Sequence, residues 1–317
     1  MKPQQIDLCP VDKAEVLILS DNHSDVLLPS GESVQRPSLA RNGVIPTDTL
    51  LAEHGLSLLV TVEREGKSRS ILLDSGYTNI AVPHNLDYLG IGLETVEALV
   101  LSHGHMDHFG ALQEVIQRAP DGIELVLHPD VFNPRALDTP AGDTVHFPPF
   151  PSKEDLAQWG ARVKENQGPL LLAGGQVLVT GEVARSTPFE KGFPGAKCRQ
   201  GEAFIPDSFR DDQSLVIHVK DKGLVVISGC AHSGIINSIQ QARQLTGTDE
   251  VFAVIGGFHL SGPAMAPAVA PTIEALKQIS PSLVCPMHCS GFKAVSALSQ
   301  ALPDSFVLSS VGSRIIL

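Results

Sequence analysis

At residues 101–110 the chain reads Leu-Ser-His-Gly-His-Met-Asp-His-Phe-Gly, so three imidazoles and one carboxylate fall within six residues. The stretch overlaps the end of a mainly apolar run at residues 96–101, which is typical of a buried strand. Four polar side chains buried without partners would cost several kcal/mol. A metal cation satisfies all four at once, and imidazole together with carboxylate suits zinc, iron or manganese. The stretch therefore predicts a metal site at the end of a strand.

The spacing within this stretch predicts how its polar residues are divided. Alternate residues of an extended chain share a side, so His103 and His105 can face one ion. Asp107 and His108, beyond the turn, can reach a second ion beside the first. Apolar residues recur at helical spacing over residues 111–116, which places the cluster on a strand-to-helix loop. Solvent-facing histidines in an ordinary loop are the alternative.

The composition limits the classes of protein and partner. With 317 residues, 43% of them hydrophobic, and a mean hydropathy of +0.10, the chain can bury a large core. A formal net charge of −12 without a block of Lys or Arg argues against long nucleic acid as a partner. The sequence shows no apolar run near the ~20 residues of a membrane span. Five cysteines without a CxxC pair favour a reducing cytoplasm over a disulfide scaffold.

Regular alternation of predicted elements favours an α/β layered sheet. Apolar runs at residues 15–20, 56–62 and 70–74 predict strands, and residues 79–89 predict a helix. From residue 129 to residue 210 prolines interrupt any long element. This segment is interpreted as an insertion or lid over the metal site, with ordinary connecting structure as the alternative.

Three later segments repeat one arrangement, in which an apolar strand ends near a histidine and a loop with Ser-Gly leads into a helix. The histidines are His232, His259 and His288. Ligands of open α/β sheets bind outside the carboxyl ends of the strands. We therefore expect these histidines to converge with residues 103–108 on one metal site, although any one of them taken alone would more often be structural.

The motif His-x-His-x-Asp-His at residues 103–108 resembles the signature of the metallo-β-lactamase superfamily. The resemblance implies a four-layer αββα sandwich of the α/β class, with a metal site at one edge of its two sheets. It also implies two divalent ions, with zinc as the first expectation and manganese or iron as alternatives, and a metal-bound hydroxide as nucleophile. Motifs at residues 228–237, 256–260 and 287–291 are similar to those of the branch named after archaeal dihydropterin–ribofuranosylaminobenzene-phosphate synthase. The matches cover most of the chain, so residues 1–317 are predicted to form one domain of this type.

The resemblance also implies roles for single residues. Asp107 would orient the nucleophile and carry a proton. Asp74, at the end of a predicted strand, would orient a ligand histidine, with a plain turn or helix cap as the alternative. Cys230 occupies the place of a metal-bridging aspartate, and His259 would be an additional ligand or a donor to the substrate. The predicted metal ligands are His103, His105 and His232 for one ion and Asp107, His108 and His288 for the other.

One ligand usual in the superfamily is absent from the sequence. A histidine normally lies a few residues before the strand that starts here at Ser214, but residues 206–213 contain none. His232 is the preferred replacement. Asp211, Asp212 or a weakly held second ion are the alternatives.

These features together predict a metal-dependent hydrolase of a small ester, lactone or phosphoester. Free N–H groups at helix starts, as at residues 233–234 and 256–257, favour an anionic or phosphate-bearing small molecule, although tight turns explain the same glycines. One alternative is a synthase that joins a pterin pyrophosphate to a second substrate, as the branch name implies. A non-catalytic metal-containing sensor and a redox enzyme that uses iron are the others.

Overall fold

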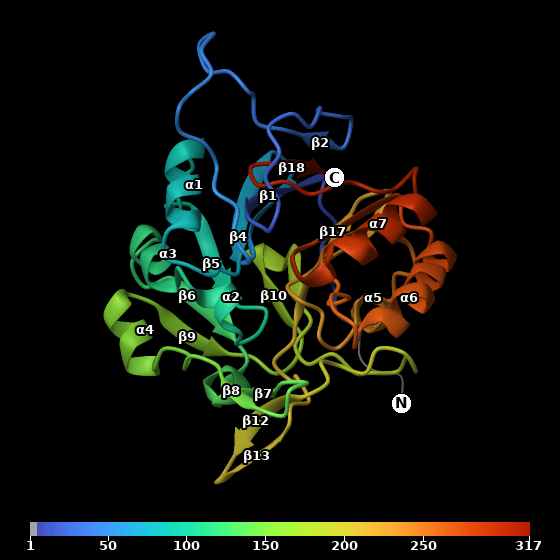
Figure 1. Cartoon of the computed structure of the whole chain (residues 1–317). Coiled ribbons are helices and arrows are strands. Elements are labelled where there is room, and N and C mark those ends of the chain that lie inside the picture. Colours follow the sequence, from blue (N-terminus) through green and yellow to red (C-terminus); the bar gives the residue numbers. More distant parts are fainter. Residues whose placement is uncertain (1–4) are drawn as a thin grey trace.

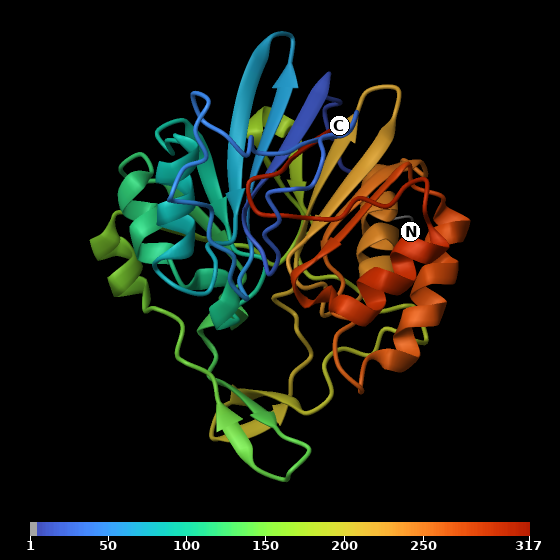
Figure 2. The same ribbon diagram turned by 45° about the horizontal axis from the view of Figure 1, so that its top comes forward.

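Two β-sheets packed face to face between two layers of helices form the body of the protein (Figure 1). The computed structural model describes residues 5–317. Across these residues the first sheet has eight strands in the order β2-β18-β1-β3-β4-β5-β6-β9, and the second has six in the order β10-β11-β14-β15-β16-β17. Figure 2 shows both sheets at the centre of the molecule with helices on either outer side. The αββα sandwich predicted from the sequence is confirmed.

The strand bounds follow the apolar runs of the sequence. The first sheet contains β2 (Val34–Gln35), β18 (Arg314–Ile316), β1 (Lys13–Ser20), β3 (Ser57–Arg64), β4 (Lys67–Leu73), β5 (Val96–Val100), β6 (Glu124–Leu127) and β9 (Arg162–Glu165). The second contains β10 (Leu170–Leu172), β11 (Val177–Val179), β14 (Ser214–Val219), β15 (Gly223–Ser228), β16 (Val251–Gly257) and β17 (Leu283–Met287). Strands β4, β5, β6 and β9 run parallel, as do β15, β16 and β17. The carboxyl ends of parallel strands therefore meet at one edge of each sheet.

Each helix layer buries one apolar stripe against its sheet. The helices over the first sheet are α1 (Ala81–Leu89), α2 (Met106–Phe109), α3 (Leu112–Arg118) and α4 (Lys153–Trp159), and those over the second are α5 (Ile235–Thr246), α6 (Ala266–Ile279) and α7 (Phe292–Ala301). In α5 the buried residues Ile235, Ile239 and Ala242 recur at the spacing of one helix face. Among residues 5–317, none of the helices has the length and hydrophobicity that a membrane span needs.

The main core lies between the two sheets and follows the two-residue period of the strands. In β3, Leu58, Val60 and Val62 face the second sheet, whereas Leu59 faces the helices of the first layer. Such alternation is what a strand covered on both faces requires, since successive side chains point to opposite sides. The close packing of this core fixes the position of one sheet edge relative to the other.

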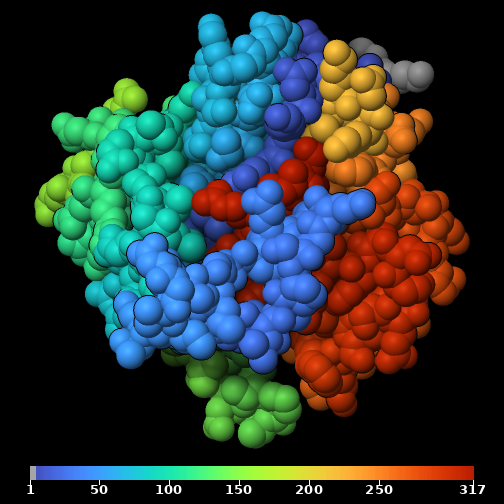
Figure 3. Space-filling model, turned by 90° about the horizontal axis from the view of Figure 1, so that it is seen from above, coloured from blue at the N-terminus to red at the C-terminus, as the bar shows by residue number. Residues whose placement is uncertain are grey.

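The segment that joins β1 to β3 lies across the surface between the two helix layers. Its first residues reach the edge where the parallel strands end. Figure 3 shows it spread over the surface between the two layers. Asn85 of α1 holds the segment, because its Nδ2 donates to the carbonyl oxygens of Leu19 and Leu51 and its Oδ1 accepts from the amide of Leu51, each at 2.8 Å. The backbone on either side of residues 20–50 is thereby fixed.

Residues 129–210, predicted as one insertion, are divided between the sandwich and a separate sheet. The accessory sheet is antiparallel, has the order β13-β12-β7-β8, and stands below the sandwich in Figure 2. Its strands are β7 (Arg135–Asp138), β8 (Thr144–His146), β12 (Ala196–Gln200) and β13 (Ala203–Pro206). The intervening β9 extends the first sheet, and β10 and β11 form one side of the second. The separate unit is therefore smaller than the predicted segment, and its role as a lid stays a prediction.

A buried arginine attaches the accessory sheet to the histidine loop. Arg135 of β7 is 4% exposed, and its Nη2 donates to Oδ2 of Asp211 at 2.6 Å. Its Nε lies 3.2 Å from Oδ2 of Asp207. The same Asp211 oxygen accepts from the amide of Gly104 at 2.8 Å. Arg135 thus links β7 to the residue between His103 and His105.

Replacing Arg135 with methionine should lower the free energy of unfolding by about 3–5 kcal/mol, because two buried carboxylates lose their counter-charge. Urea unfolding followed by circular dichroism measures the change. Arg118→Met is the matched control, since the ion pair of Arg118 with Asp87 lies at the surface and should contribute less than about 1 kcal/mol. A loss for Arg135→Met no larger than that of the control would contradict the anchoring role.

Candidate metal centre

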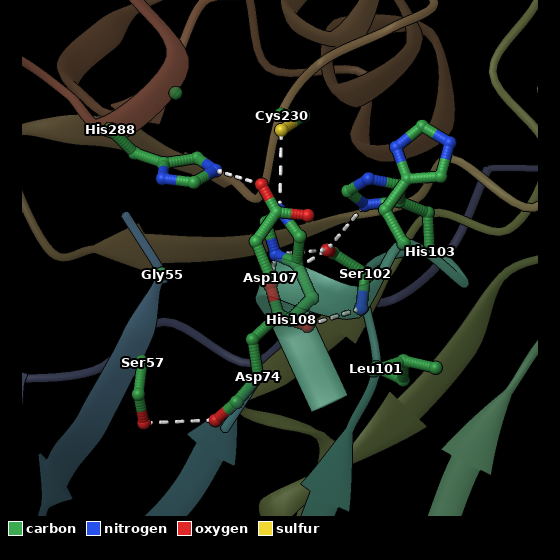
Figure 4. Close-up of polar contacts among 12 residues, drawn as sticks. Gly55, Ser57, Asp74, Leu101, Ser102, His103, Asp107, His108, Cys230 and His288 are labelled. Carbon is green, nitrogen blue, oxygen red and sulfur yellow. Dashed lines mark hydrogen bonds and ion pairs between the residues drawn. The ribbon is translucent and has the colours of Figure 1, made fainter. Parts of the chain in front are cut away.

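Strand ends from both sheets bring the predicted site residues together at one edge of the sandwich. The loop after β5 supplies His103 and His105, and the short helix α2 that follows supplies Asp107 and His108. Cys230 and His232 follow β15, His259 follows β16, and His288 follows β17. Figure 4 shows Asp107 and His108 of the first sheet facing Cys230 and His288 of the second. The convergence expected from the strand-end pattern is therefore present.

The first group of ligand atoms brings together imidazole nitrogens of His103, His105 and His232, and Sγ of Cys230 lies within 4.8 Å of the nitrogens of His103 and His232. Nε2 of His232 lies 3.2 Å from Nε2 of His103 and 3.2 Å from Nδ1 of His105. Burial, followed by the charge of Arg135, lowers the pKa of His105 to about 3, and burial with neighbouring histidines lowers the pKa of His103 and of His232. All three rings are therefore neutral, and their lone pairs are available to a cation.

A test of the fit is whether these buried nitrogens have other partners. Nδ1 of His103 lies 3.0 Å from Oγ of Ser102, so its Nε2 faces the group. The contacts that Nδ1 of His105 and Nε2 of His232 make at hydrogen-bond distance, within residues 5–317, are with imidazole nitrogens of this same group. Three buried neutral imidazole nitrogens that meet in this way cannot all satisfy one another, and they are costly unless a shared partner binds them. The donor set and its burial fit a metal ion.

The second group combines a carboxylate, two imidazoles and a thiol. The ligand atoms of Asp107, His108, Cys230 and His288 all lie within 4.8 Å of one another. Nε2 of His288 lies 3.3 Å from Oδ2 of Asp107, and Nε2 of His108 lies 3.2 Å from Sγ of Cys230. The mixture of oxygen, nitrogen and sulfur donors suits a divalent transition metal.

Charge in the second group also favours a cation. Burial would lower the pKa of His108, but the carboxylates of Asp74 and Asp107 outweigh it and raise the pKa to about 9. Burial would raise the pKa of Asp107, yet His108 and His288 hold it well below its usual range. The two carboxylates therefore require a positive charge at this point, which a proton on His108 or a metal ion can supply.

Asp74 orients His108 by a contact on the side of the ring opposite to the second group. Oδ2 of Asp74 lies 2.6 Å from Nδ1 of His108 and accepts from Oγ of Ser102 at 2.7 Å, while Oδ1 accepts from the Ser102 amide at 2.7 Å. Since a carboxylate oxygen only accepts, the proton of His108 is on Nδ1, and Nε2 is directed into the second group (Figure 4). The contact predicted for Asp74 is present.

Asp21, for which the sequence predicts no site role, supports His288. Oδ1 of Asp21 accepts from the His288 amide at 2.8 Å, and Nδ2 of Asn22 donates to the His288 carbonyl at 2.8 Å. His288 has a left-handed φ of 52°, and His259 and Ala231, at the neighbouring strand ends, have φ of 44° and 53°. Left-handed backbone at non-glycine residues costs energy and persists where surrounding contacts enforce it, often at functional sites.

His232 lies among the converging ligand-type side chains and stays the candidate for the place of the histidine that is absent before Ser214. Asp211 is bound by Arg135 and the Gly104 amide, and Oδ2 of Asp212 accepts from the Ser233 amide at 2.7 Å. Burial raises the pKa of Asp212 to about 6. Neither carboxylate belongs to a group of converging ligand atoms among the described residues, whereas His232 does. Asp212 instead supports the turn that presents His232.

His54 is a residue that the sequence analysis missed as a site candidate. Its Nε2 lies 3.7 Å from Oδ2 of Asp107, its ring centroid lies 4.9 Å from that of His288, and its side chain is 62% exposed. The next residue, Gly55, is packed so closely that a Cβ would lie 2.3 Å from the Tyr77 amide nitrogen. The spacing of residues 52–57 does not predict a site role for His54, because its position beside Asp107 depends on contacts with residues far along the chain.

Comparison with known proteins gives three findings. The family model described as "Metallo-beta-lactamase superfamily" matches residues 52–235, more than half of the chain. A 7,8-dihydropterin-6-methyl-4-(beta-D-ribofuranosyl)-aminobenzene-5'-phosphate synthase of Methanocaldococcus jannaschii is 31% identical over 258 residues, covering 80% of this chain and 87% of the relative. The crystal structure of Tm1679, named a metal-dependent hydrolase of the beta-lactamase superfamily, superimposes with a TM-score of 0.71 at 22% identity, covering 95% of this chain and 98% of that one.

Replacing Asp74 with asparagine should weaken metal binding about 10–100-fold, because His108 loses the carboxylate that sets its tautomer and orientation. Competition with a chromophoric chelator measures the affinity. Asp87→Asn, which changes an exposed carboxylate on α1, serves as the control and should leave the affinity unchanged. Equal affinities for the two variants would show that Asp74 does not act through His108.

Proposed function

This chain belongs to the metallo-beta-lactamase superfamily, and we propose that it is a metal-dependent hydrolase of a small ester, lactone or phosphoester. The observation that carries the proposal is the pairing of two groups of converging ligand atoms with an exposed imidazole beside them. Water between such groups can be activated, and a substrate can approach from the side where His54 is exposed.

Two divalent ions are proposed, with zinc as the first choice and manganese or iron as alternatives. His103, His105 and His232 would hold one ion, and Asp107, His108 and His288 the other. Such an ion would supply a nucleophile at neutral pH, since metals lower the pKa of bound water from 15.7 to about 7. Cys230 lies within reach of both groups and is the candidate bridging ligand.

The surrounding side chains would orient the reacting groups and exclude bulk water. Asp107 lies between His288 and His54, so its second oxygen can orient a water molecule or accept its proton. Phe147 and Phe209 pack against the ring of His105 with centroid separations of 5.0 and 5.7 Å. Because these aromatic rings exclude water on this side, electrostatic interactions between the polar groups next to them are stronger.

The substrate would bind beside His288. A cavity of about 230 Å³ is lined there by Asn22, His23, Gly291 and Phe292, among other residues. Its volume suits a small molecule. Helix α7 begins at Phe292, so its first amides and the helix dipole favour an anionic group on the substrate, including a phosphate.

A second candidate function is condensation by a synthase. The observation in its favour is the 31% identity with the archaeal synthase over most of both chains. In such a reaction the ions would bind a pyrophosphate leaving group while a carbon–carbon bond forms to a pterin. A non-catalytic metal-containing sensor would instead bind metal and small ligand without turnover.

A substrate panel separates these functions. We expect the metal-loaded protein to hydrolyse at least one member of a set of lactones, carboxylic esters and phosphoesters, and to lose that activity after chelation. Release of pyrophosphate from a pterin pyrophosphate only when a second substrate is present would favour the synthase. Full metal loading with no turnover across the panel would favour the sensor and contradict both enzymes.

Replacing His105 with alanine should remove metal from the first group and lower kcat/KM at least roughly 100-fold, because that group loses one of its three nitrogens. Elemental analysis and kinetics on the best panel substrate measure the two effects. His84→Ala, on α1 and hydrogen-bonded to the Thr49 carbonyl, is the control and should retain both properties. A His105 variant that keeps its metal and activity would overturn the ligand assignment.

Replacing His54 with glutamine should lower kcat/KM about tenfold or more while the metal content stays constant. Partial desolvation and the neighbouring His288 lower the pKa of His54, so its imidazole is neutral near pH 7 and can exchange a proton with substrate. Kinetics together with elemental analysis distinguish this result from metal loss. His84→Gln is the control, and equal kinetics for the two variants would exclude a role of His54 in turnover.

A further inference from the structure

A third cluster of ligand-type side chains adjoins the two groups described above. It consists of Cys230, His259 and Cys289, whose ligand atoms all lie within 4.8 Å of one another. Cys230 and Cys289 are 2% and 6% exposed. Only Cys230 is shared with the other groups, so His259 and Cys289 have no part in the two-ion site proposed above.

The imidazole of His259 is enclosed by protein but makes no hydrogen bonds within the described residues. Both of its ring nitrogens are buried and have no hydrogen-bond partner within the described part of the chain. Its ring centroid lies 4.1 Å from that of His232 and 4.8 Å from that of Phe193, so two of its neighbours are rings. A buried imidazole with both nitrogens free is costly, and a bound cation would remove that cost at one of them.

The absence of a side chain at Gly257, at the end of β16, allows the two cysteines to lie close together. A Cβ on Gly257 would lie 2.7 Å from Sγ of Cys289 and 2.4 Å from the carbonyl oxygen of Gly229, so only glycine fits. Sγ of Cys289 also lies 3.5 Å from the carbonyl oxygen of Cys230. The end of β17 therefore reaches the end of β15 across the strand between them, and the left-handed φ of His259 is part of the same arrangement.

We propose that Cys230, His259 and Cys289 form a third metal subsite that binds a soft or borderline cation, of which zinc is the natural one. Two thiolates and one imidazole are a donor set that such cations prefer over magnesium or calcium. Three protein ligands leave one tetrahedral position for water or another exogenous ligand. Cys230 connects this subsite to the other two groups. The proposal does not depend on which reaction the protein catalyses.

The experiment uses the full chain, stripped of metal under reducing conditions and then titrated with Co²⁺. Elemental analysis gives the ions bound per chain, and sulfur-to-cobalt charge-transfer absorption reports thiolate ligation. We expect the wild type to bind one ion more than either Cys289→Ser or His259→Ala, with weaker charge-transfer absorption in Cys289→Ser. Cys198→Ser, which removes a buried cysteine of the accessory sheet, is the matched control and should behave as the wild type.

His105→Ala separates this proposal from the one on function. That variant should lose an ion from the first group and keep the thiolate absorption, because His105 is not a member of the third cluster. Equal binding by the wild type, Cys289→Ser and His259→Ala would overturn the third subsite, whatever the total number of ions bound. So would a count of three thiols instead of five in the denatured, unreduced protein, since Cys230 and Cys289 would then form a disulfide.

Discussion

The contact between strand ends of opposite sheets is the constraint on which the site depends. The loop after β5 belongs to the first sheet and the loop after β15 to the second, yet Nε2 of His232 lies 3.2 Å from imidazole nitrogens of both His103 and His105. Uncharged nitrogens buried at this separation require a common partner, because water is excluded and they cannot all satisfy one another. The close packing of the two sheets therefore brings together buried nitrogens that a cation would satisfy, and it leaves room for that cation between them.

Buried carboxylates next to the cluster hold the strand-end loops and their side chains in position. Asp74 fixes the tautomer of His108, Asp21 binds the backbone of His288, and Asp212 binds the turn that presents His232. Each joins a predicted ligand or its backbone to a different part of the fold, which fixes the position of that side chain at the sheet edge. Gly229 adds a steric limit, since a Cβ there would lie 2.0 Å from Oγ of Ser102, the hydroxyl that binds Asp74. The site is thus organised by hydrogen bonds and close backbone contacts, and the same contacts bring Cys230 toward Cys289.

Much of the fold could be predicted from the sequence because it is encoded in short patterns. Runs of apolar residues predicted β1, β3 and β4, and a helical period predicted α1, all confirmed within a few residues. The extent of the accessory sheet could not be predicted in this way. β7 pairs with β12, about sixty residues further on, and the residues between them return to the two main sheets. Prolines show where long elements are interrupted, but they do not show which strands pair across the interruption.

The sequence by itself determined the supply of ligand-type side chains and their positions after apolar strands, since these follow from spacings of two to four residues. The αββα class was implied by the resemblance of the His-x-His-x-Asp-His motif to a known superfamily. Only the tertiary structure decided which of them meet. His232 lies beside His103 although 129 positions separate them, whereas Asp211 and Asp212, in the segment where a histidine is usual, are bound to backbone amides instead. His54 reaches Asp107 in the same way. The reason is physical: local periodicity fixes the direction of a side chain from its own strand or helix, but its neighbours are set by how the two sheets pack.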